Sequence, residues 1–262
     1  MNKTNPRFSH DNITNRRKYT GVHWHDDYEL YYMVNGTTKY FIGDEIFQIA
    51  NGDFVIIPPS MYHMTDSEGC LYNERYLIGF ELGRIDKRAY SALNKLCEKK
   101  VVRVQKSKLG ILEDIFLKLE EEYSGEKNPV LIDLYMTELV IKLERLCAEY
   151  KPCLSEADML IHEISRYISI NYSSDLSLDN LSKKFAMSAS HLSRRFKAVA
   201  GIGITEYITY VRILNAEKLL KMSGLPVTEV AAACGFNDSN YFSTVFKRIK
   251  GTTPLKFSKK FI

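Results

Sequence analysis

HLSRRFKAVAG at residues 191–201 and YFSTVFKRIKG at residues 241–251 are two copies of one pattern, and they decide the fold of the C-terminal part of the chain. Aligned at an offset of 50, the copies share a serine, a phenylalanine, a lysine and a closing glycine. Upstream, the same offset aligns Leu181 with Ala231. Self-similarity over this length indicates that one small structural unit occurs twice.

Each copy has the signals of a helix-turn-helix (HTH) motif, which are two short helices, a cap before each and a turn between them. We expect the first HTH motif over residues 177–200 and the second over residues 228–250. The turn of the first contains Ala186-Met187, and Gly235 supplies the turn of the second. The expected helix caps are the small polar or acidic residues Ser177, Ser188, Thr228 and Asp238.

The second helix of each motif has one apolar face and one polar face. The apolar stripes, expected in the core, consist of Leu192, Phe196, Val199, Phe242, Val245, Phe246 and Ile249. The polar faces, predicted to contact DNA, consist of Ser190, Ser193, Arg194, Lys197, Ser239, Asn240, Ser243, Thr244 and Lys247. Side chains of these types bind base edges or phosphates, and Arg194 suits a bidentate contact to guanine. For either helix taken alone, the alternative is that its polar face contacts only solvent and binds no DNA.

The chain has 262 residues, a length that predicts two domains. Charge is distributed unevenly between its two halves. Residues 155–262 contain 15 Lys and Arg against 9 Asp and Glu, a net charge of +6, whereas the rest of the chain has a net charge of −2. We therefore expect the C-terminal domain, residues 151–262, to meet double-stranded DNA, with a second domain over residues 1–150. The polar N-terminus and the lack of long apolar runs predict a cytoplasmic protein without membrane contact.

Between the two motifs, residues 205–222 read as one long helix. A helix of this length spans roughly 27 Å. Successive major-groove faces on one side of a duplex lie about 34 Å apart. The spacing therefore allows both second helices to reach one face of the same DNA.

These stretches resemble the AraC/XylS family of transcription regulators. The resemblance is in HLSRRFK (191–197), EYITYVRILNAEKLL (206–220) and VAAACGFNDSNYFSTVFKRIKGTTP (230–254), with a departure at Gly203-Ile204, where the family usually has Ser, Thr or Pro. It implies a promoter-binding regulator, usually an activator, that meets RNA polymerase. It also implies a homodimer, paired through helices, whose N-terminal barrel senses a small molecule, often a sugar.

The N-terminal part reads as an antiparallel β-barrel followed by a helical hairpin, which makes the chain an α+β protein. Expected strands are 28–34, 38–42, 46–49, 54–58 and 75–82. Tight hairpins are predicted at Asn35-Gly36 and Asn51-Gly52, with a weaker signal at Gly43-Asp44. Apolar residues at helical spacing place the hairpin at about 107–150, where it either pairs two chains or packs on the sheet. The basic arm, residues 1–18, either folds over the barrel or is disordered.

Two segments of the barrel, HWHDDYELYYMVNG (23–36) and GDFVIIPPSMYH (52–63), resemble the two cupin motifs, with Ser60 where cupins usually have Gly. His23, His25 and Glu29 are separated by even numbers of residues, so on one strand their side chains would face the same side. His63 would complete a three-histidine, one-carboxylate set for a divalent metal ion. The alternative is a metal-free pocket, for which the expected ligand-binding residues are His23, His25, Glu29, Tyr31 and His63.

Three functions follow from these patterns. A ligand-responsive transcription regulator that is not an enzyme and requires no cofactor accounts for both halves of the chain. A metal-dependent cupin enzyme fused to a DNA-binding module is the alternative. An unliganded, constitutive regulator is the third. Among catalytic signatures, the sequence offers no Ser/His/Asp set, no Cys/His set and no Gly-rich phosphate loop.

Overall fold

The computed structural model describes residues 7–14, 23–66, 72–148, 155–222 and 224–259. Contacts divide the chain into an N-terminal unit, residues 1–154, and a C-terminal unit, residues 155–262. The predicted boundary at residue 150 lies outside the described residues, as do residues 1–6 and 15–18 of the basic arm. No helix in the described ranges combines the length and apolarity needed to cross a membrane.

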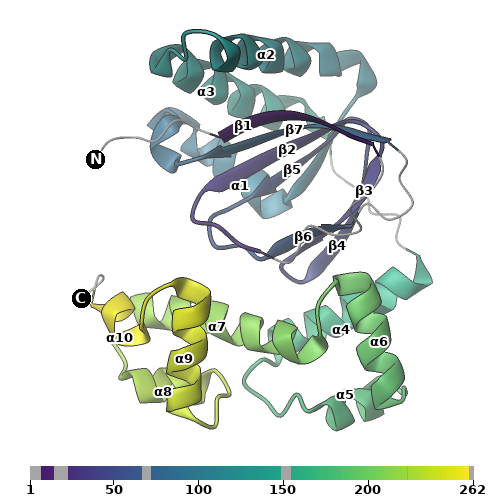
Figure 1. The fold of residues 1–262 in the computed structure, drawn as a ribbon, viewed down its shortest axis with the longest axis vertical. Helices are drawn as coiled ribbons and strands as arrows, with labels where there is room; N and C mark the ends of the chain where they lie inside the picture. Colours follow the sequence, from purple (N-terminus) through teal and green to yellow (C-terminus); the bar gives the residue numbers. More distant parts are fainter. Residues whose placement is uncertain (1–6, 15–22, 67–71, 149–154, 223, 260–262) are drawn as a thin grey trace. The chain divides into compact units, whose positions relative to one another are not determined.

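The described strands of the N-terminal unit form two antiparallel sheets, as predicted for this part of the chain (Figure 1). One sheet has the order β1-β7-β2-β5-β8-β9, and the other has the order β4-β3-β6. The strands are β1 (Arg7–Thr14), β2 (Tyr28–Asn35), β3 (Thr37–Ile42), β4 (Glu45–Ala50), β5 (Asp53–Ile57), β6 (His63–Asp66), β7 (Tyr72–Phe80), β8 (Val101–Val104) and β9 (Cys147–Ala148).

The central strands of the larger sheet, β2 and β5, are buried on both faces, and strand alternation sorts their side chains between these faces. Leu30 and Tyr32 of β2 pack with Phe116 of the helical layer. Tyr31 and Met33 point to the opposite face, where they pack against the smaller sheet. The apolar residues of this inner layer are Tyr31, Met33, Tyr40, Ile42, Phe47, Ile49, Val55, Ile57 and Val101.

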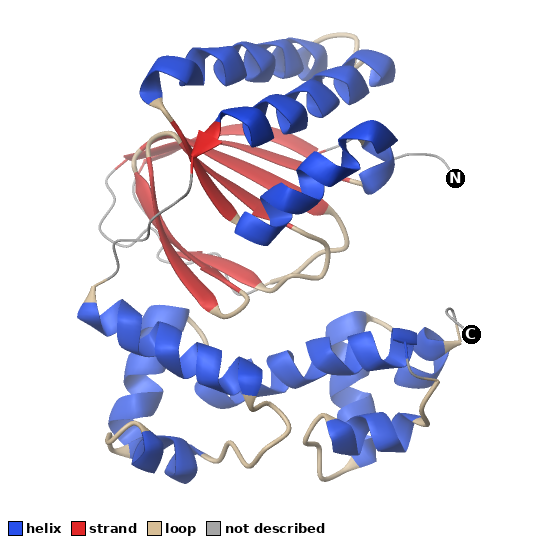
Figure 2. Ribbon diagram, turned by 180° about the vertical axis from the view of Figure 1, so that it is seen from behind, coloured by secondary structure: helices blue, strands red, loops and turns tan. Residues whose placement is uncertain are grey.

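A helical layer covers the outer face of the larger sheet (Figure 2). It consists of η1 (Leu82–Arg84), η2 (Lys87–Ala89), α1 (Tyr90–Lys99), α2 (Lys106–Ser124) and α3 (Pro129–Leu146). The predicted hairpin is confirmed as α2 and α3, and Asn128 caps α3 by accepting hydrogen bonds from the next turn. Helix α3 ends at Leu146, before the predicted limit of 150, because Cys147 is extended and pairs with β8 in the sheet.

The predicted hairpins at the two Asn-Gly steps are wrong. Asn35-Gly36 and Asn51-Gly52 are corners, because β2 and β5 belong to the larger sheet whereas β3 and β4 belong to the smaller one. The Asn51 side chain joins the two corners: its Oδ1 accepts a hydrogen bond from Gly36 N at 2.8 Å, and its Nδ2 donates one to Asn35 Oδ1 at 3.3 Å. The tight hairpin lies at the weaker signal, Gly43-Asp44, between β3 and β4.

The described part of the C-terminal unit is helical. Its helices are α4 (Glu156–Ile170), α5 (Leu178–Lys184), α6 (Ala189–Ala200), α7 (Ile204–Met222), α8 (Val227–Ala233), α9 (Ser239–Lys250) and α10 (Pro254–Ser258). The first HTH motif consists of α5 and α6, the second consists of α8 and α9, and the predicted long helix between them is confirmed as α7 (Figure 1).

Two details of the predicted HTH motifs are wrong. Thr228 is not a cap, because the chain already turns helical at Val227, and Pro226, with extended backbone, takes the N-cap position. The alignment of Leu181 with Ala231 is also wrong. Helices α6 and α9 do correspond at an offset of 50, but α5 and α8 correspond at an offset of 49, because the second turn is one residue longer.

Candidate nucleic-acid interface and barrel cluster

The recognition helix of the first HTH motif, α6, begins at a serine cap. Ser188 Oγ accepts a hydrogen bond from His191 N at 3.3 Å, and Gly201 ends the helix in the left-handed conformation with φ 73°. Leu192 and Phe196 are fully buried and attach the helix to the unit. The local sequence therefore sets where α6 starts, where it stops and which face it hides.

The predicted DNA-contacting residues of α6 lie on the opposite face. Ser190, Arg194 and Lys197 are exposed, and Ser193 is half-buried at the edge. A guanidinium and an ammonium group on one helix face form a cationic surface of about one helix width, which fits the major groove. The face can bind both phosphates and base edges.

Helix α9 of the second HTH motif repeats this construction with other residues. Asp238 Oδ1 accepts a hydrogen bond from Asn240 N at 2.7 Å, and Phe242, Val245 and Phe246 are the buried residues of the helix. Of the predicted contact residues, three are exposed and two are half-buried: Asn240, Thr244 and Lys247, then Ser239 and Ser243. The Thr244 hydroxyl donates to the Asn240 carbonyl at 2.9 Å, so its oxygen is left to act as an acceptor toward a further group.

Besides Ala198, three further exposed residues of the recognition helices escaped the sequence prediction: His191, Tyr241 and Arg248. Tyr241 is 54% exposed, which is unusual for a large aromatic side chain. His191 and Tyr241 occupy the same position in the repeated pattern, so each motif exposes a ring beside its polar face. The alignment itself contained this signal.

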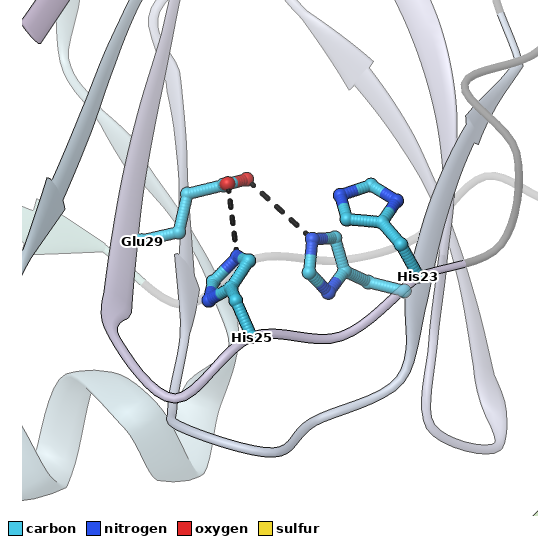
Figure 3. Close-up of side chains that lie close together, drawn as sticks. His23, His25 and Glu29 are labelled. Carbon is cyan, nitrogen blue, oxygen red and sulfur yellow. Dashed lines mark hydrogen bonds and ion pairs between the residues drawn. The ribbon is translucent and has the colours of Figure 1, made fainter. Parts of the chain in front are cut away.

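Four polar residues of the N-terminal unit form what we call the barrel cluster: His23, His25, Glu29 and His63 (Figure 3). One ligand atom from each lies within 4.8 Å of the others. Their convergence was predicted, but the argument from even spacing on one strand is wrong, because β2 begins only at Tyr28. His23 instead reaches the cluster through an isolated bridge in which its backbone exchanges hydrogen bonds of 3.2 and 3.1 Å with His63.

Backbone carbonyls orient two of the imidazoles. His25 Nδ1 donates to the Asp27 carbonyl at 2.8 Å, and His63 Nδ1 donates to the Met61 carbonyl at 2.9 Å. The Nε2 atoms of both rings then face the Glu29 carboxylate, at 3.2 Å from His25 and 3.8 Å from His63. This is how metal-binding histidines are commonly held, with one nitrogen fixed by a carbonyl and the other presented.

The barrel cluster places one carboxylate among three imidazoles, and its environment shifts the pKa values of His25, His63 and Glu29. The hydrogen bond to Glu29 raises the pKa of His25, although burial opposes this. Burial lowers the pKa of His63 to about 4, so its Nε2 holds a lone pair at neutral pH. Burial would raise the pKa of Glu29, but His25 and the other two histidines lower it overall. Without a proton or a cation between them, lone pairs and carboxylate would repel.

The residues of the barrel cluster fit a divalent metal ion. Nε2 of His63 is buried and lacks a hydrogen-bond partner among the described residues. Three imidazoles and one carboxylate are the donors that Zn²⁺, Mn²⁺, Fe²⁺ or Ni²⁺ accept. The same groups can hydrogen-bond the hydroxyls of an organic ligand.

The aromatic residues of the barrel are packed rather than open. Tyr31 is fully buried, 5.2 Å from the Tyr40 ring in an edge-on contact, and the Arg75 guanidinium carbon lies 5.6 Å from its centroid. Tyr28 stacks on Phe80 at 5.5 Å and faces the helical layer. Tyr31 is therefore part of the packed layer between the two sheets, whereas Tyr28 lies on the other face of the larger sheet.

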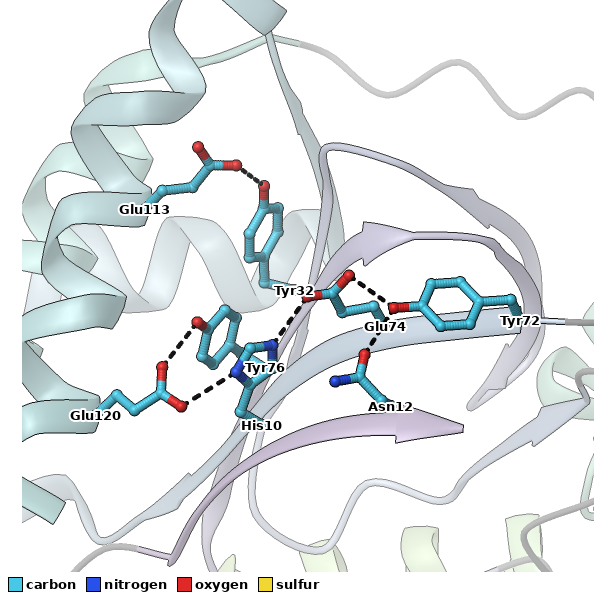
Figure 4. Close-up of polar contacts among 8 residues, drawn as sticks. All are labelled: His10, Asn12, Tyr32, Tyr72, Glu74, Tyr76, Glu113 and Glu120. Atoms are coloured by element: carbon cyan, nitrogen blue, oxygen red, sulfur yellow. Dashed lines mark hydrogen bonds and ion pairs between the residues drawn. The ribbon is translucent and has the colours of Figure 1, made fainter. Parts of the chain in front are cut away.

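Part of the N-terminal arm is a strand, since β1 pairs along the whole described length with β7. Its His10 bridges two carboxylates, with Nδ1 3.1 Å from Glu120 of α2 and Nε2 3.1 Å from Glu74 of β7 (Figure 4). Tyr76 also donates to Glu120 at 3.1 Å. These bonds attach the strand to the edge of the sheet and to the helical layer.

Comparison with known proteins matches both units. Residues 10–140 match the model of the AraC-like ligand binding domain, which is half of the chain, and residues 181–260 match a helix-turn-helix domain. The HTH-type transcriptional activator RhaR of Enterobacter sp. (strain 638) is 24% identical over 241 residues, covering 90% of this chain and 86% of the relative.

One further relative and one solved structure are also similar to this chain. The RhaR of Escherichia coli (strain K12) is 27% identical over 240 residues, covering 88% of this chain and 84% of that protein. Among solved structures, the C-terminal domain of AraT, a response regulator from Geobacillus stearothermophilus, is 30% identical. It covers 40% of this chain and 88% of the domain, with a TM-score of 0.38.

Proposed function

This chain belongs to the AraC family of ligand-responsive, DNA-binding transcription regulators, and we propose that a small effector controls it by binding at the barrel cluster. The observation that carries the proposal is the convergence of three imidazoles and one carboxylate in the N-terminal unit. A buried polar atom without a hydrogen bond costs free energy, and His63 Nε2 has no such partner among the described residues, so an occupant that binds it stabilises the cluster. The effector is a sugar or another small metabolite, bound directly or through a divalent metal ion.

Effector binding has to favour one of two states of the protein to change DNA binding. The loop that supplies His23 and His25 is tied to β6 through His63, so an occupant orders both together. Ser60, at φ 62°, donates its N–H to the His25 carbonyl at 2.7 Å, which places a strained residue beside the cluster. Release or retention of this strain is one way to distinguish the two states.

Further parts of the proposal concern partners. A groove of about 520 Å³ runs along α3, beside Leu134 and Ile141. Leu134 is 58% exposed, and a second copy of the chain would cover it in a homodimer. RNA polymerase is the partner expected of an activator, and the cytoplasm is the compartment in which such a regulator meets promoter DNA.

A metal-dependent enzyme is the second candidate, because a three-histidine, one-carboxylate set also suits catalysis at an open metal position. It predicts a stoichiometric metal together with turnover of the barrel ligand. The regulator proposal, in contrast, predicts no turnover and a change in DNA affinity when the ligand is added.

The test uses the full-length protein with its metal content measured after purification. Thermal melting is then followed with Zn²⁺, Mn²⁺ and a panel of monosaccharides, with and without a chelator, in wild type, His63→Gln and the exposed control His191→Gln. We expect at least one ligand to raise Tm in wild type and His191→Gln but not in His63→Gln. Loss of a sugar's effect in the chelator means that the metal holds it. Equal shifts in wild type and His63→Gln would contradict the proposal.

A further inference from the structure

The two HTH motifs are connected by α7, and a second joint between them lies at the middle of that helix. Arg212 Nε donates to the Tyr172 carbonyl at 2.8 Å, and Arg212 Nη2 donates to the Ser174 carbonyl at 2.9 Å. Both carbonyls belong to the α4–α5 connection, the segment that leads into the first HTH motif. One side of the guanidinium is therefore fixed to the segment that leads into the first motif.

The same guanidinium also reaches the turn of the second HTH motif. Its carbon lies 5.9 Å from the centroid of the Phe236 ring. Next to Phe236, Gly235 packs so closely that a Cβ there would lie 2.9 Å from the Ser173 carbonyl oxygen and 3.0 Å from Arg212 Nη2. The turn of the second motif therefore rests on the segment that precedes the first, with Arg212 at the contact.

We propose that Arg212 is a positioning residue that fixes the separation of α6 and α9, and thereby sets the half-site spacing that the protein accepts in DNA. A planar guanidinium with two donors held by carbonyls defines an orientation that a flexible ammonium would not. Two recognition helices held at one separation bind a matched operator without a further ordering cost. Two recognition helices whose separation is not fixed must be ordered on every operator that they bind, but they tolerate other spacings.

Direct contact between Arg212 and DNA is the competing explanation. Two of its donors point to carbonyls of its own unit, and burial, the largest influence, lowers the pKa of the guanidinium. A phosphate-binding arginine would instead extend into solvent, as exposed Arg194 does on α6. Loss of a phosphate contact would weaken all operators alike, whereas loss of the joint changes their ranking.

The experiment starts from a duplex selected by the full-length protein from random DNA, and it uses three versions of it: the selected spacing between the two contact tracts, and spacings one base pair shorter and longer. Dissociation constants are measured for wild type, Arg212→Met and Arg166→Met, the same exchange at an exposed position of α4. In Arg212→Met we expect about tenfold weaker binding at the selected spacing and a spacing preference reduced at least threefold. Arg166→Met should keep the wild-type preference.

An equal loss at all three spacings, or no loss, would overturn the proposal. Thermal melting of each variant is measured alongside. Should Arg212→Met melt below the assay temperature, Arg212→Lys, which keeps the charge but has a single donor nitrogen, is measured in its place. A reduced spacing preference in folded Arg212→Lys supports the joint, and an unchanged preference contradicts it. Failure to select any duplex would contradict DNA binding itself, which is a separate outcome.

Discussion

The two HTH motifs are built from one repeated pattern, yet their turns obey different constraints. Both turns contain a residue with positive φ, which is Ala186 at 50° in the first motif and Gly235 at 79° in the second. Alanine bears the backbone strain in the first turn. In the second, the backbone approaches Ser173 so closely that only hydrogen fits in the place of Cβ. The neighbouring segment, rather than the turn itself, decides which residue is required.

Attachment of the recognition helices differs as well. Helix α6 packs on α7 through the rings of Phe196 and Tyr207, whose centroids lie 5.3 Å apart. Helix α9 packs on α7 through apolar residues of one shared core cluster, and it is also tied to α7 by an ion pair. Glu217 of α7 lies 2.5 Å from Lys250, whose side chain is 5% exposed, and 2.7 Å from Lys221 of its own helix. The second motif therefore adds a buried charge pair to the kind of apolar contact that both recognition helices make with α7.

The largest effect is expected from Gly235→Ala, which adds a Cβ where the structure has no room and forces alanine to positive φ. We expect it to destabilise the C-terminal unit by about 3 kcal/mol, as strained and overpacked substitutions do. Urea unfolding monitored by circular dichroism measures the effect. A change below about 0.5 kcal/mol, the range of neutral surface exchanges, would show that the contact with Ser173 is not tight.

Glu217→Gln should cost about 2 kcal/mol at pH 7, because it leaves the Lys250 ammonium buried without its counter-ion. Burial raises the pKa of Glu217, but the two lysines lower it overall from its ordinary 4.5. A carboxylate with a lowered pKa stabilises the fold above its ordinary pKa, and this stability is lost as pH falls through the lowered value. The difference between wild type and variant should therefore shrink below pH 4.5.

The matched control for this charge change is Glu163→Gln on α4, where the side chain is exposed. Its stability should follow wild type at every pH. A Glu217→Gln deficit that stays constant from pH 7 to pH 3 would mean that packing, not charge, holds α9 on α7.

On DNA the two motifs should also differ. Arg194→Ala should weaken binding by about 2 kcal/mol and relax the preference at one base pair, since a bidentate guanine contact is lost. Lys247→Ala should weaken binding to all sequences by a similar factor and reduce the salt slope by about 1. Titrations at several salt concentrations distinguish them. Unchanged affinity and preference in Arg194→Ala would mean that α6 is misassigned as a recognition helix.

The smallest expected effect is a gain in stability. Ala186→Gly removes the strain of a left-handed alanine in the first turn, and against the added entropy of glycine in the unfolded chain it should stabilise by about 0.5 kcal/mol. Urea midpoints of the variant and wild type suffice for the comparison. A loss of stability would mean that the Ala186 methyl group makes a contact worth more than the strain.

Sequence alone predicted what local chemistry controls. The repeated stripes located α6 and α9, and Ser188, Asp238 and Gly251 marked their ends because caps depend on a few neighbouring residues. Prediction from the sequence failed where contacts between distant segments determine the structure. Nothing local distinguishes Asn51-Gly52 as a corner between sheets from a hairpin, because both need positive φ. Strands β1, β6, β8 and β9 are short or polar and exist through their partners.

The barrel cluster shows the same limit. Its four residues could be named from residue types and spacing, but the reason for their convergence could not. His23 and His63 meet through a backbone bridge, and Asp27 and Met61 orient rings through carbonyl groups that carry no sequence signature. Arg212 was predicted only as part of a long helix, although its contacts join the segment before the first HTH motif to the turn of the second.

The most direct test of the account is a footprint of the full-length protein on a duplex that it selects from random DNA. Two HTH motifs on one duplex predict two protected tracts in successive major grooves, about 10 base pairs apart on one face. Arg194→Ala should erase protection in one tract and Lys247→Ala should weaken the other. A single tract, or protection that both substitutions alter at the same bases, would contradict the claim that α6 and α9 read DNA together.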